Sequence, residues 1–143
     1  MKPIVSTIGI NNYQDIADAY IRTFKPSWWQ LLLGRVIIAL VDENYTSLHF
    51  DKLAEIIAID QSDRQQYEAE LFDCDDFALS LLGAMHRDRE TAGMPIFFTG
   101  VNTPRGGHAV LSYYYQGEIY IIEPQNDEIF PVPQDWSLMI VLG

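Results

Sequence analysis

Three residues whose side chains can together perform nucleophilic chemistry occur in the order Cys74, His108 and Glu123. Cys74 is the only cysteine, and it follows Asp73, which the pattern predicts as the N-cap of an amphipathic helix. The unpaired N–H groups and the positive dipole end of a first helical turn favour a thiolate. The same amides can stabilise negative charge that develops on a substrate oxygen. The spacing therefore makes Cys74 a candidate nucleophile.

A predicted hairpin connects the other two residues of this set. Gln116-Gly117 has the composition of a hairpin turn, and the flanking strands place His108 and Glu123 almost opposite each other. A carboxylate beside an imidazole orients the ring as a base. Each residue alone has a more common structural explanation, as a buried thiol, a hydrogen-bonded strand histidine or a strand-end glutamate. Their occurrence together favours the chemical interpretation.

The surroundings of the cysteine carry several negative charges. Asp73, Asp75 and Asp76 flank it, and nearby negative charge disfavours a thiolate. Either the thiol is inert or a positive group offsets the charges. Two adjacent aspartates in a first helical turn are also ordinary partners of the helix dipole.

The elements that must position these residues divide into a helical first part and a β-rich second part. Apolar spacing predicts helices at 13–24, 28–41 and 50–59, and a fourth that begins after Asp73 and ends before Gly93. We expect the second helix, with Trp28 and Trp29, to be buried. After Gly93 the chain is rich in β-branched and aromatic residues. We therefore predict one α+β domain over 1–143, helical over about 1–93 and β over about 94–143.

Composition narrows the classes of partner. Nine Lys plus Arg against twenty Asp plus Glu give a net charge of −11, so phosphate neutralisation is missing, and we expect no nucleic-acid or membrane partner. The acidity suits divalent cations or basic proteins, and a solvated acidic surface explains it equally well. No signal peptide or membrane span is recognisable, so a cytoplasmic location is the default expectation.

Three sequence stretches resemble a known family. "FDCDDFA", "GGHAVLSYY" and "IYIIEPQND" are similar to the papain-like cysteine protease domain at the C-terminus of the fairy-ring mushroom agglutinin family and to related phage and bacterial domains. The resemblance covers about residues 72–127. It implies a papain-like fold with N-terminal helices packed on a C-terminal antiparallel sheet. It also implies Cys74 as nucleophile, His108 as general base and then acid, and Glu123 as orienting carboxylate.

The resemblance further implies a divalent cation, typically Ca²⁺. Its ligands would be Asp75, Asp76, Gln125 and Asn126, and the cation would offset the charges around the thiol. The family carries a sugar-binding β-trefoil before its protease domain, for which the preceding residues here are too few, so no lectin activity is transferred. Gln65 and Gln66 are candidates for the oxyanion-hole side chain, although their spacing departs from the papain pattern.

The function expected from the sequence is therefore a calcium-dependent papain-like cysteine peptidase. It would hydrolyse the amide bond of a peptide or protein substrate through an acyl-enzyme. One alternative is a transglutaminase-like acyl transferase, in which an amine replaces water. Another is a non-catalytic calcium-binding or interaction module with a vestigial site, and a third is a plain globular domain with a buried thiol.

Overall fold

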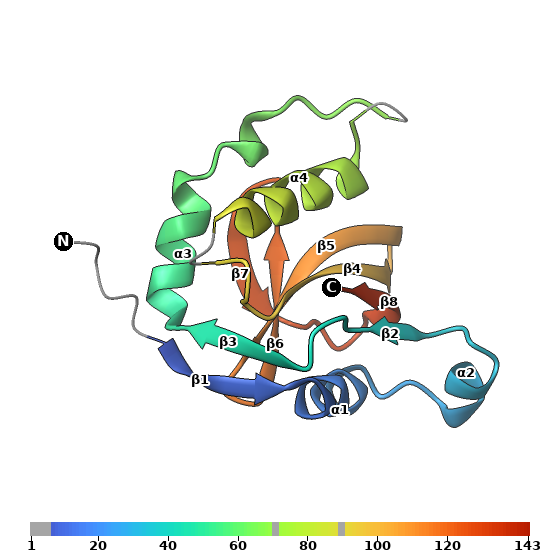
Figure 1. The fold of residues 1–143 in the computed structure, drawn as a ribbon. Coiled ribbons are helices and arrows are strands. Elements are labelled where there is room, and N and C mark those ends of the chain that lie inside the picture. Colours follow the sequence, from blue (N-terminus) through green and yellow to red (C-terminus); the bar gives the residue numbers. More distant parts are fainter. Residues whose placement is uncertain (1–6, 70–71, 89–90) are drawn as a thin grey trace.

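The computed structural model describes residues 7–69, 72–88 and 91–143. A six-stranded sheet with the strand order β2-β8-β4-β5-β6-β7 organises the molecule, and β1 and β3 form a separate two-stranded sheet (Figure 1). The elements in chain order are β1 (Thr7–Asn12), α1 (Tyr13–Phe24), α2 (Trp28–Leu32), β2 (Ile37–Ala39), β3 (Asn44–Leu48), α3 (Phe50–Ile59), η1 (Ser62–Arg64), α4 (Cys74–Arg87), β4 (Ile96–Thr103), β5 (Gly106–Tyr115), β6 (Glu118–Glu123), β7 (Glu128–Pro131) and β8 (Ser137–Leu142).

Neighbouring strands of the large sheet are antiparallel, except at one edge. Strands β4 to β7 follow one another as a meander, and β8 returns from the chain end to pair with β4 on its other side. On its other side β8 pairs with β2, and these two strands are parallel. The edge strand thus comes from the first third of the chain and the strand beside it from the last few residues.

Helices cover both faces of this sheet, because side chains alternate between the two faces along each strand. On one face α3 and α4 enclose a core with β4, β5 and β6 residues, to which Leu53, Leu81, Ala109, Leu111 and Ile122 belong. On the other face α1 packs against Phe97, Tyr114 and Val141. Successive residues of a central strand therefore face the α3 and α4 side and the α1 side in turn.

A buried chain of hydroxyl groups fastens α1 to the sheet. The Tyr20 hydroxyl lies 2.5 Å from Ser112 Oγ, which lies 2.5 Å from Thr99 Oγ1, and all three residues are 0% exposed. Burial raises the pKa of Tyr20 because the phenolate would lose its hydration. Buried polar groups are tolerated here because each has a hydrogen-bond partner.

Three of the four predicted helices are present, and the predicted N-cap of the last one, Asp73, is confirmed. The helix predicted at 13–24 is α1, that at 50–59 is α3, and α4 begins at Cys74 with Asp73 as N-cap. However, α4 ends at Arg87 with Asp88 as C-cap, several residues before Gly93. The Gln116-Gly117 turn is also confirmed, since Tyr115 pairs with Glu118 and both turn residues have positive φ.

The helix predicted at 28–41 is wrong over most of its length. Only Trp28–Leu32 is helical, Gly34 turns the chain with φ 65°, and Ile37–Ala39 forms β2. Trp28 and Trp29 are 62% and 56% exposed, so they are not core residues. The sequence pattern fails here because an apolar run has the same composition in a buried helix, a strand or an exposed protrusion.

The predicted fold class, with N-terminal helices packed on a C-terminal antiparallel sheet, is contradicted as well. Strands β1, β2 and β3 interrupt the part predicted as helical, and β2 adds a parallel edge to the sheet. The structure is mainly a β-sheet with a few helices upon it. Among the described residues no helix is long and apolar enough to cross a membrane.

Candidate ligand-binding site

A cleft of about 470 Å³ lies at the end of the sheet where β4 turns into β5. The β4–β5 turn forms one wall, the end of β6 and the start of β7 form another, and the loop before β8 closes it. Its lining combines two aromatic rings with a majority of polar side chains. The lining residues are Thr103, Pro104, Arg105, Gly107, His108, Glu123, Asn126, Glu128, Phe130 and Trp136.

His108 and Glu123 form the polar centre of the cleft. His108 Nε2 lies 2.7 Å from Glu123 Oε2, and the two side chains are 24% and 15% exposed. The register pairs Leu111 with Ile122, so Glu123 falls one step further along, beside Val110 and diagonal to His108. The predicted hairpin thus brings the two residues together, with an offset of two positions.

The hydrogen bonds of the pair assign the ring nitrogens. Glu123 Oε1 accepts the backbone N–H of Gln125 at 3.2 Å, so both carboxylate oxygens are engaged. Because an ionised carboxylate only accepts hydrogen bonds, Nε2 carries the ring proton. His108 Nδ1 is then the ring nitrogen left for a ligand.

Two aromatic side chains form the apolar part of the cleft. The Trp136 ring stands edge-on to His108 with centroids 6.2 Å apart and edge-on to Phe130 at 5.9 Å. Both aromatic side chains pack beside a core of Val101, Val110 and Ile121. Their contact with the core holds Trp136 in place, while the half-buried indole still lines the cleft.

The β4–β5 turn places a positive charge at the rim. Arg105 is exposed at its tip, where the Thr103 hydroxyl accepts the Arg105 backbone N–H at 3.1 Å. Gly106 has φ 114°, a conformation that only glycine adopts without strain, so the two glycines before His108 serve the turn. Arg105 is a cationic lining residue opposite the carboxylates of Glu123 and Glu128.

Cys74 lies in a different environment from this pair. Its side chain packs against the core beneath α4, a core that includes Ala109. Since neighbouring strand residues point to opposite faces, His108 projects away from that core, toward the side of Val101 and Val110. Within the described ranges no hydrogen bond joins the Cys74 thiol to His108, and Cys74 is not among the residues that line the cleft.

The structure therefore joins two of the three predicted catalytic residues, His108 and Glu123, through a hydrogen bond. A nucleophile needs its base within hydrogen-bond reach. The catalytic roles predicted for Cys74, His108 and Glu123 are otherwise untested and stay predictions. The rate of Cys74 alkylation by iodoacetamide, compared between native protein and His108→Ala, measures whether the two side chains cooperate.

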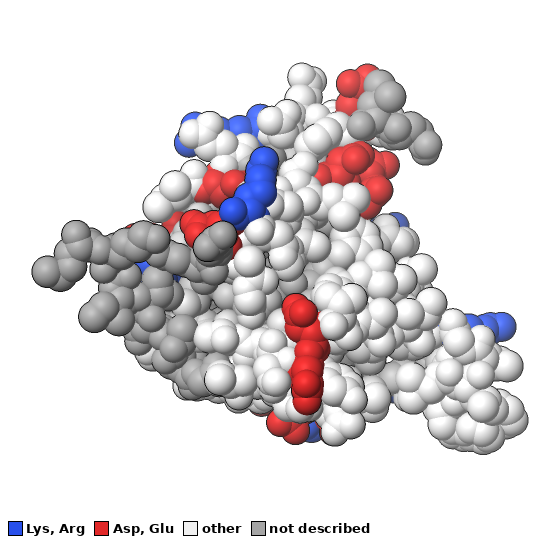
Figure 2. Space-filling model, viewed as in Figure 1, with Lys and Arg blue, Asp and Glu red and all other residues white. Residues whose placement is uncertain are grey.

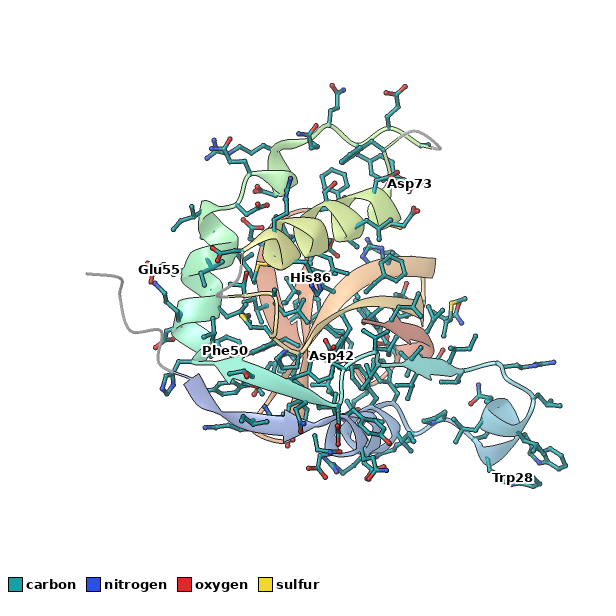
Figure 3. All side chains as sticks on the ribbon, in the orientation of Figure 1. Trp28, Asp42, Phe50, Glu55, Asp73 and His86 are labelled. Carbon is teal, nitrogen blue, oxygen red and sulfur yellow. The ribbon has the colours of Figure 1, made fainter. Side chains whose placement is uncertain are left out.

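Two of the predicted metal ligands, Asp76 and Asn126, accept backbone hydrogen bonds in different parts of the chain. Asp76 Oδ2 accepts the Asp73 backbone N–H at 3.2 Å within a capping box, while Asn126 Oδ1 accepts the Glu128 backbone N–H at 3.0 Å beside the cleft. Potential ligand atoms of Asp73, Cys74 and Asp75 instead lie within 4.8 Å of one another at the head of α4, where Figure 3 labels Asp73. A side-chain hydrogen bond that the protonated Asp75 carboxyl makes to Asp73 raises the pKa of Asp75, and burial and the nearby charges of Asp73 and Asp76 act in the same direction.

The carboxyl group of Asp127 makes the free energy of unfolding depend on pH. Burial, followed by the charges of Asp63 and Asp60, raises its pKa from 3.8 to about 6. Between these values the folded protein binds more protons than the unfolded chain, so the free energy of unfolding falls as pH rises from about 4 to 6. We expect Asp127→Asn to flatten this fall, because asparagine fits the positive φ of 62° and carries no charge.

Melting temperatures between pH 4 and pH 7 measure the effect. Asp135→Asn, at an exposed position, serves as the control and should retain the native pH profile. An Asp127→Asn profile that matches the native one would show that this carboxyl does not contribute.

Sequence reasoning found the polar pair and missed the aromatic wall. Trp136, Phe130, Arg105 and Glu128 come from the turns and strands around His108 and Glu123. A tryptophan between proline-containing turns and the last strand is one sequence signal for them. It does not show that β8 lies beside β4, which is what brings Trp136 to His108.

Comparison with known proteins identifies a structural neighbour and no family. Neither a protein-family model nor a curated protein matches the chain. A solved structure described as "PSL1a-E64 complex" matches with a TM-score of 0.77 at 18% identity, over 94% of this chain and 51% of that one. A structure of Polyporus squamosus lectin bound to the human-type influenza-binding epitope Neu5Aca2-6Galb1-4GlcNAc matches with a TM-score of 0.74 at 17% identity, over 94% and 49%. The chain thus spans about half the length of these proteins.

These matches correct the assignment made from the sequence. One of these two neighbours is described as a lectin, and the resemblance to a papain-like cysteine protease domain, the papain-like fold class, the peptidase function and the enzyme assignment are contradicted. A peptide substrate has no support. At this identity the likeness shows the fold alone.

Proposed function

We propose that this chain is a carbohydrate-binding domain and that the saccharide occupies the cleft beside Trp136. One observation carries the proposal: an aromatic ring held by the core stands beside a hydrogen-bonded His–Glu pair in a cleft of about 470 Å³. Ligand sites typically combine an apolar wall with a few fixed polar groups.

The chemistry of a sugar ring matches this lining. A pyranose presents C–H groups on one face, which pack on an aromatic ring, and hydroxyl groups around its rim, which need donors and acceptors. Trp136 supplies the aromatic surface. His108 Nδ1 is a ring nitrogen that can form a hydrogen bond with a hydroxyl group, and the side-chain amide of Asn126 is a donor because its oxygen already accepts the Glu128 backbone N–H.

Arg105 and the neighbour's ligand indicate which saccharide to examine first. The Polyporus squamosus lectin is bound to an epitope that contains Neu5Ac, a sugar with a carboxylate. A guanidinium binds a carboxylate through two parallel hydrogen bonds, and Arg105 is placed at the rim of the cleft. We propose that an acidic saccharide binds more tightly than its neutral counterpart.

Calorimetric titration of the chain tests this function. The ligands are Neu5Acα2-6Galβ1-4GlcNAc and the same saccharide without Neu5Ac. We expect saturable binding of both, with the acidic ligand tighter, and loss of that difference in Arg105→Gln. If neither ligand produces a binding signal at concentrations up to about 10 mM, where even weak sites fill, the proposal is overturned.

We also propose a divalent cation, Ca²⁺ in the first instance, at the head of α4. Asp73 Oδ1 is buried without a hydrogen-bond partner among the described residues, and the Asp75 carboxyl lies beside it. Oxygen donors of this kind suit calcium. The cation would bind Asp73 Oδ1 and offset the negative charges of Asp73 and Asp75. The contacts favour Asp73 with Asp75 as ligands over the set of Asp75, Asp76, Gln125 and Asn126, which remains untested.

Thermal unfolding with Ca²⁺ and with chelator measures this cation. A ligand that binds only the folded state at 100 times its dissociation constant stabilises by about 2.7 kcal/mol, so we expect a rise in Tm of several degrees. Asp75→Asn should abolish the rise. Asp51→Asn, at the corresponding turn of α3, should leave it intact. An equal rise in both variants, or none in the native protein, would contradict the site.

A further inference from the structure

The segment around α2 projects from the body of the protein as an apolar tip (Figure 1). We define the α2 tip as residues 28–37. Figure 3 labels Trp28 at its outer end, far from the helices and strands of the core. The large side chains of the tip are exposed to solvent: Trp28 62%, Trp29 56%, Leu31 39%, Leu32 67%, Leu33 62% and Ile37 48%.

This exposed tip has a defined shape. Ser27 and Gln30 form a capping box at the start of α2, and the Arg35 backbone N–H donates to Gln30 O at 2.9 Å. The two indole rings stack with centroids 3.9 Å apart. At the base Val36 is buried in the core beneath α1. The tip is thus attached firmly, and its apolar side chains have no partner within the described residues that would bury them.

The charge around the tip is opposite to that of the whole protein. The chain carries twenty acidic residues and a net charge of −11, yet residues 25–41 contain none of the acids. Of the two cations in this stretch, Lys25 precedes the tip and Arg35 lies within it, and both are exposed. On the face shown in Figure 2, the protruding lobe carries no acidic side chain and has a basic one beside it.

We propose that the α2 tip inserts into the surface of a lipid membrane that contains anionic headgroups. Tryptophan and leucine partition into the boundary between headgroups and acyl chains, and lysine and arginine next to them attract anionic lipid. Only the headgroup region is entered, since a five-residue helix is far too short to span a bilayer.

Charge favours this occupant over a second copy of the chain. Two tips in contact would bring two Lys25 and two Arg35 side chains together, and like charges repel. An anionic membrane complements them. The acidic body does not prevent the approach, because charges more than about 8 Å from a surface are largely screened at physiological salt. The tip projects away from that body (Figure 1).

Co-sedimentation with lipid vesicles tests the proposal. The vesicles contain phosphatidylcholine alone or phosphatidylcholine with phosphatidylserine. We expect the native chain to bind the second kind more tightly, with a blue shift of tryptophan emission. The double variant Trp28→Ser, Leu32→Ser should bind at least tenfold more weakly. Leu79→Ser, which removes an apolar side chain 52% exposed on α4, is the matched control and should bind like the native protein.

A second pair of substitutions separates the charge from the apolar contact. Lys25→Gln with Arg35→Gln should remove the preference for phosphatidylserine while some binding to phosphatidylcholine persists. Because all four positions are exposed, each variant should keep the native melting temperature. Failure of the native chain to sediment with either vesicle would overturn the proposal. A native dimer that the Trp28→Ser, Leu32→Ser variant dissociates, without vesicle binding, would also overturn it and assign the tip to a contact between copies.

Discussion

Phe97→Ala is expected to lower the free energy of unfolding by about 3–5 kcal/mol, which is a large part of the stability of an ordinary domain. Phe97 is 0% exposed near the start of β4, with its ring centroid 6.2 Å from that of Tyr20 in α1 and 5.1 Å from that of Tyr45 in β3. Its ring is where α1, the small sheet and the large sheet meet. Alanine would leave a cavity that three separate elements cannot close by small shifts.

Urea unfolding followed by circular dichroism measures this loss. Ile10→Ala is the control, because that side chain is 75% exposed in β1 and its removal should change the free energy by less than about 0.5 kcal/mol. A loss below about 1 kcal/mol for Phe97→Ala would show that this core relaxes around the missing ring. The slope with urea should be unchanged, since the variant alters stability and not the surface exposed on unfolding.

Trp136→Ala is expected to weaken saccharide binding at least tenfold, equivalent to about 1.4 kcal/mol. The indole is the larger aromatic surface of the cleft, and its packing against Phe130 presents it in a fixed orientation. Aromatic anchors in such positions contribute a disproportionate share of binding energy. The hydrogen-bonding groups of His108 and Asn126 remain in the variant, so the loss reports on the apolar contact.

Calorimetric titration of three variants gives this prediction its controls. Trp136→Phe keeps an aromatic ring and should recover part of the affinity, which loss of stability alone would not explain. Trp28→Ala removes an indole that lies on the α2 tip, outside the cleft, and should bind the saccharide like the native chain. Equal binding by Trp136→Ala and native protein would place the saccharide elsewhere or exclude it.

Local patterns were sufficient for much of the secondary structure. The bounds of α1 follow from apolar spacing between a capping residue, Asn12, and Pro26 two residues beyond the helix. The Gln116-Gly117 turn sets the β5–β6 register, and that register brings Glu123 to His108. In each case the deciding residues lie within a few positions of one another, so a sequence window contains them.

The secondary structure was predicted wrongly where a segment pairs with another that lies far away in the sequence. The apolar run from Trp28 to Val41 divides into an exposed tip and a strand because β8, a hundred residues later, offers β2 a parallel edge. The roles predicted for Cys74 and His108 stay untested; along β5, Ala109 faces the core beneath α4 and His108 faces the other side.

The sequence by itself determined three of the helices, the hairpin and the pairing of His108 with Glu123, because these depend on local hydrogen bonds and on side-chain periods. Only the tertiary structure decided that Trp136 completes the cleft and that the α2 tip is exposed. These facts depend on which strands lie side by side and on which face of the sheet each helix covers. Those arrangements minimise the exposed apolar area of the whole chain, a quantity that no local pattern contains.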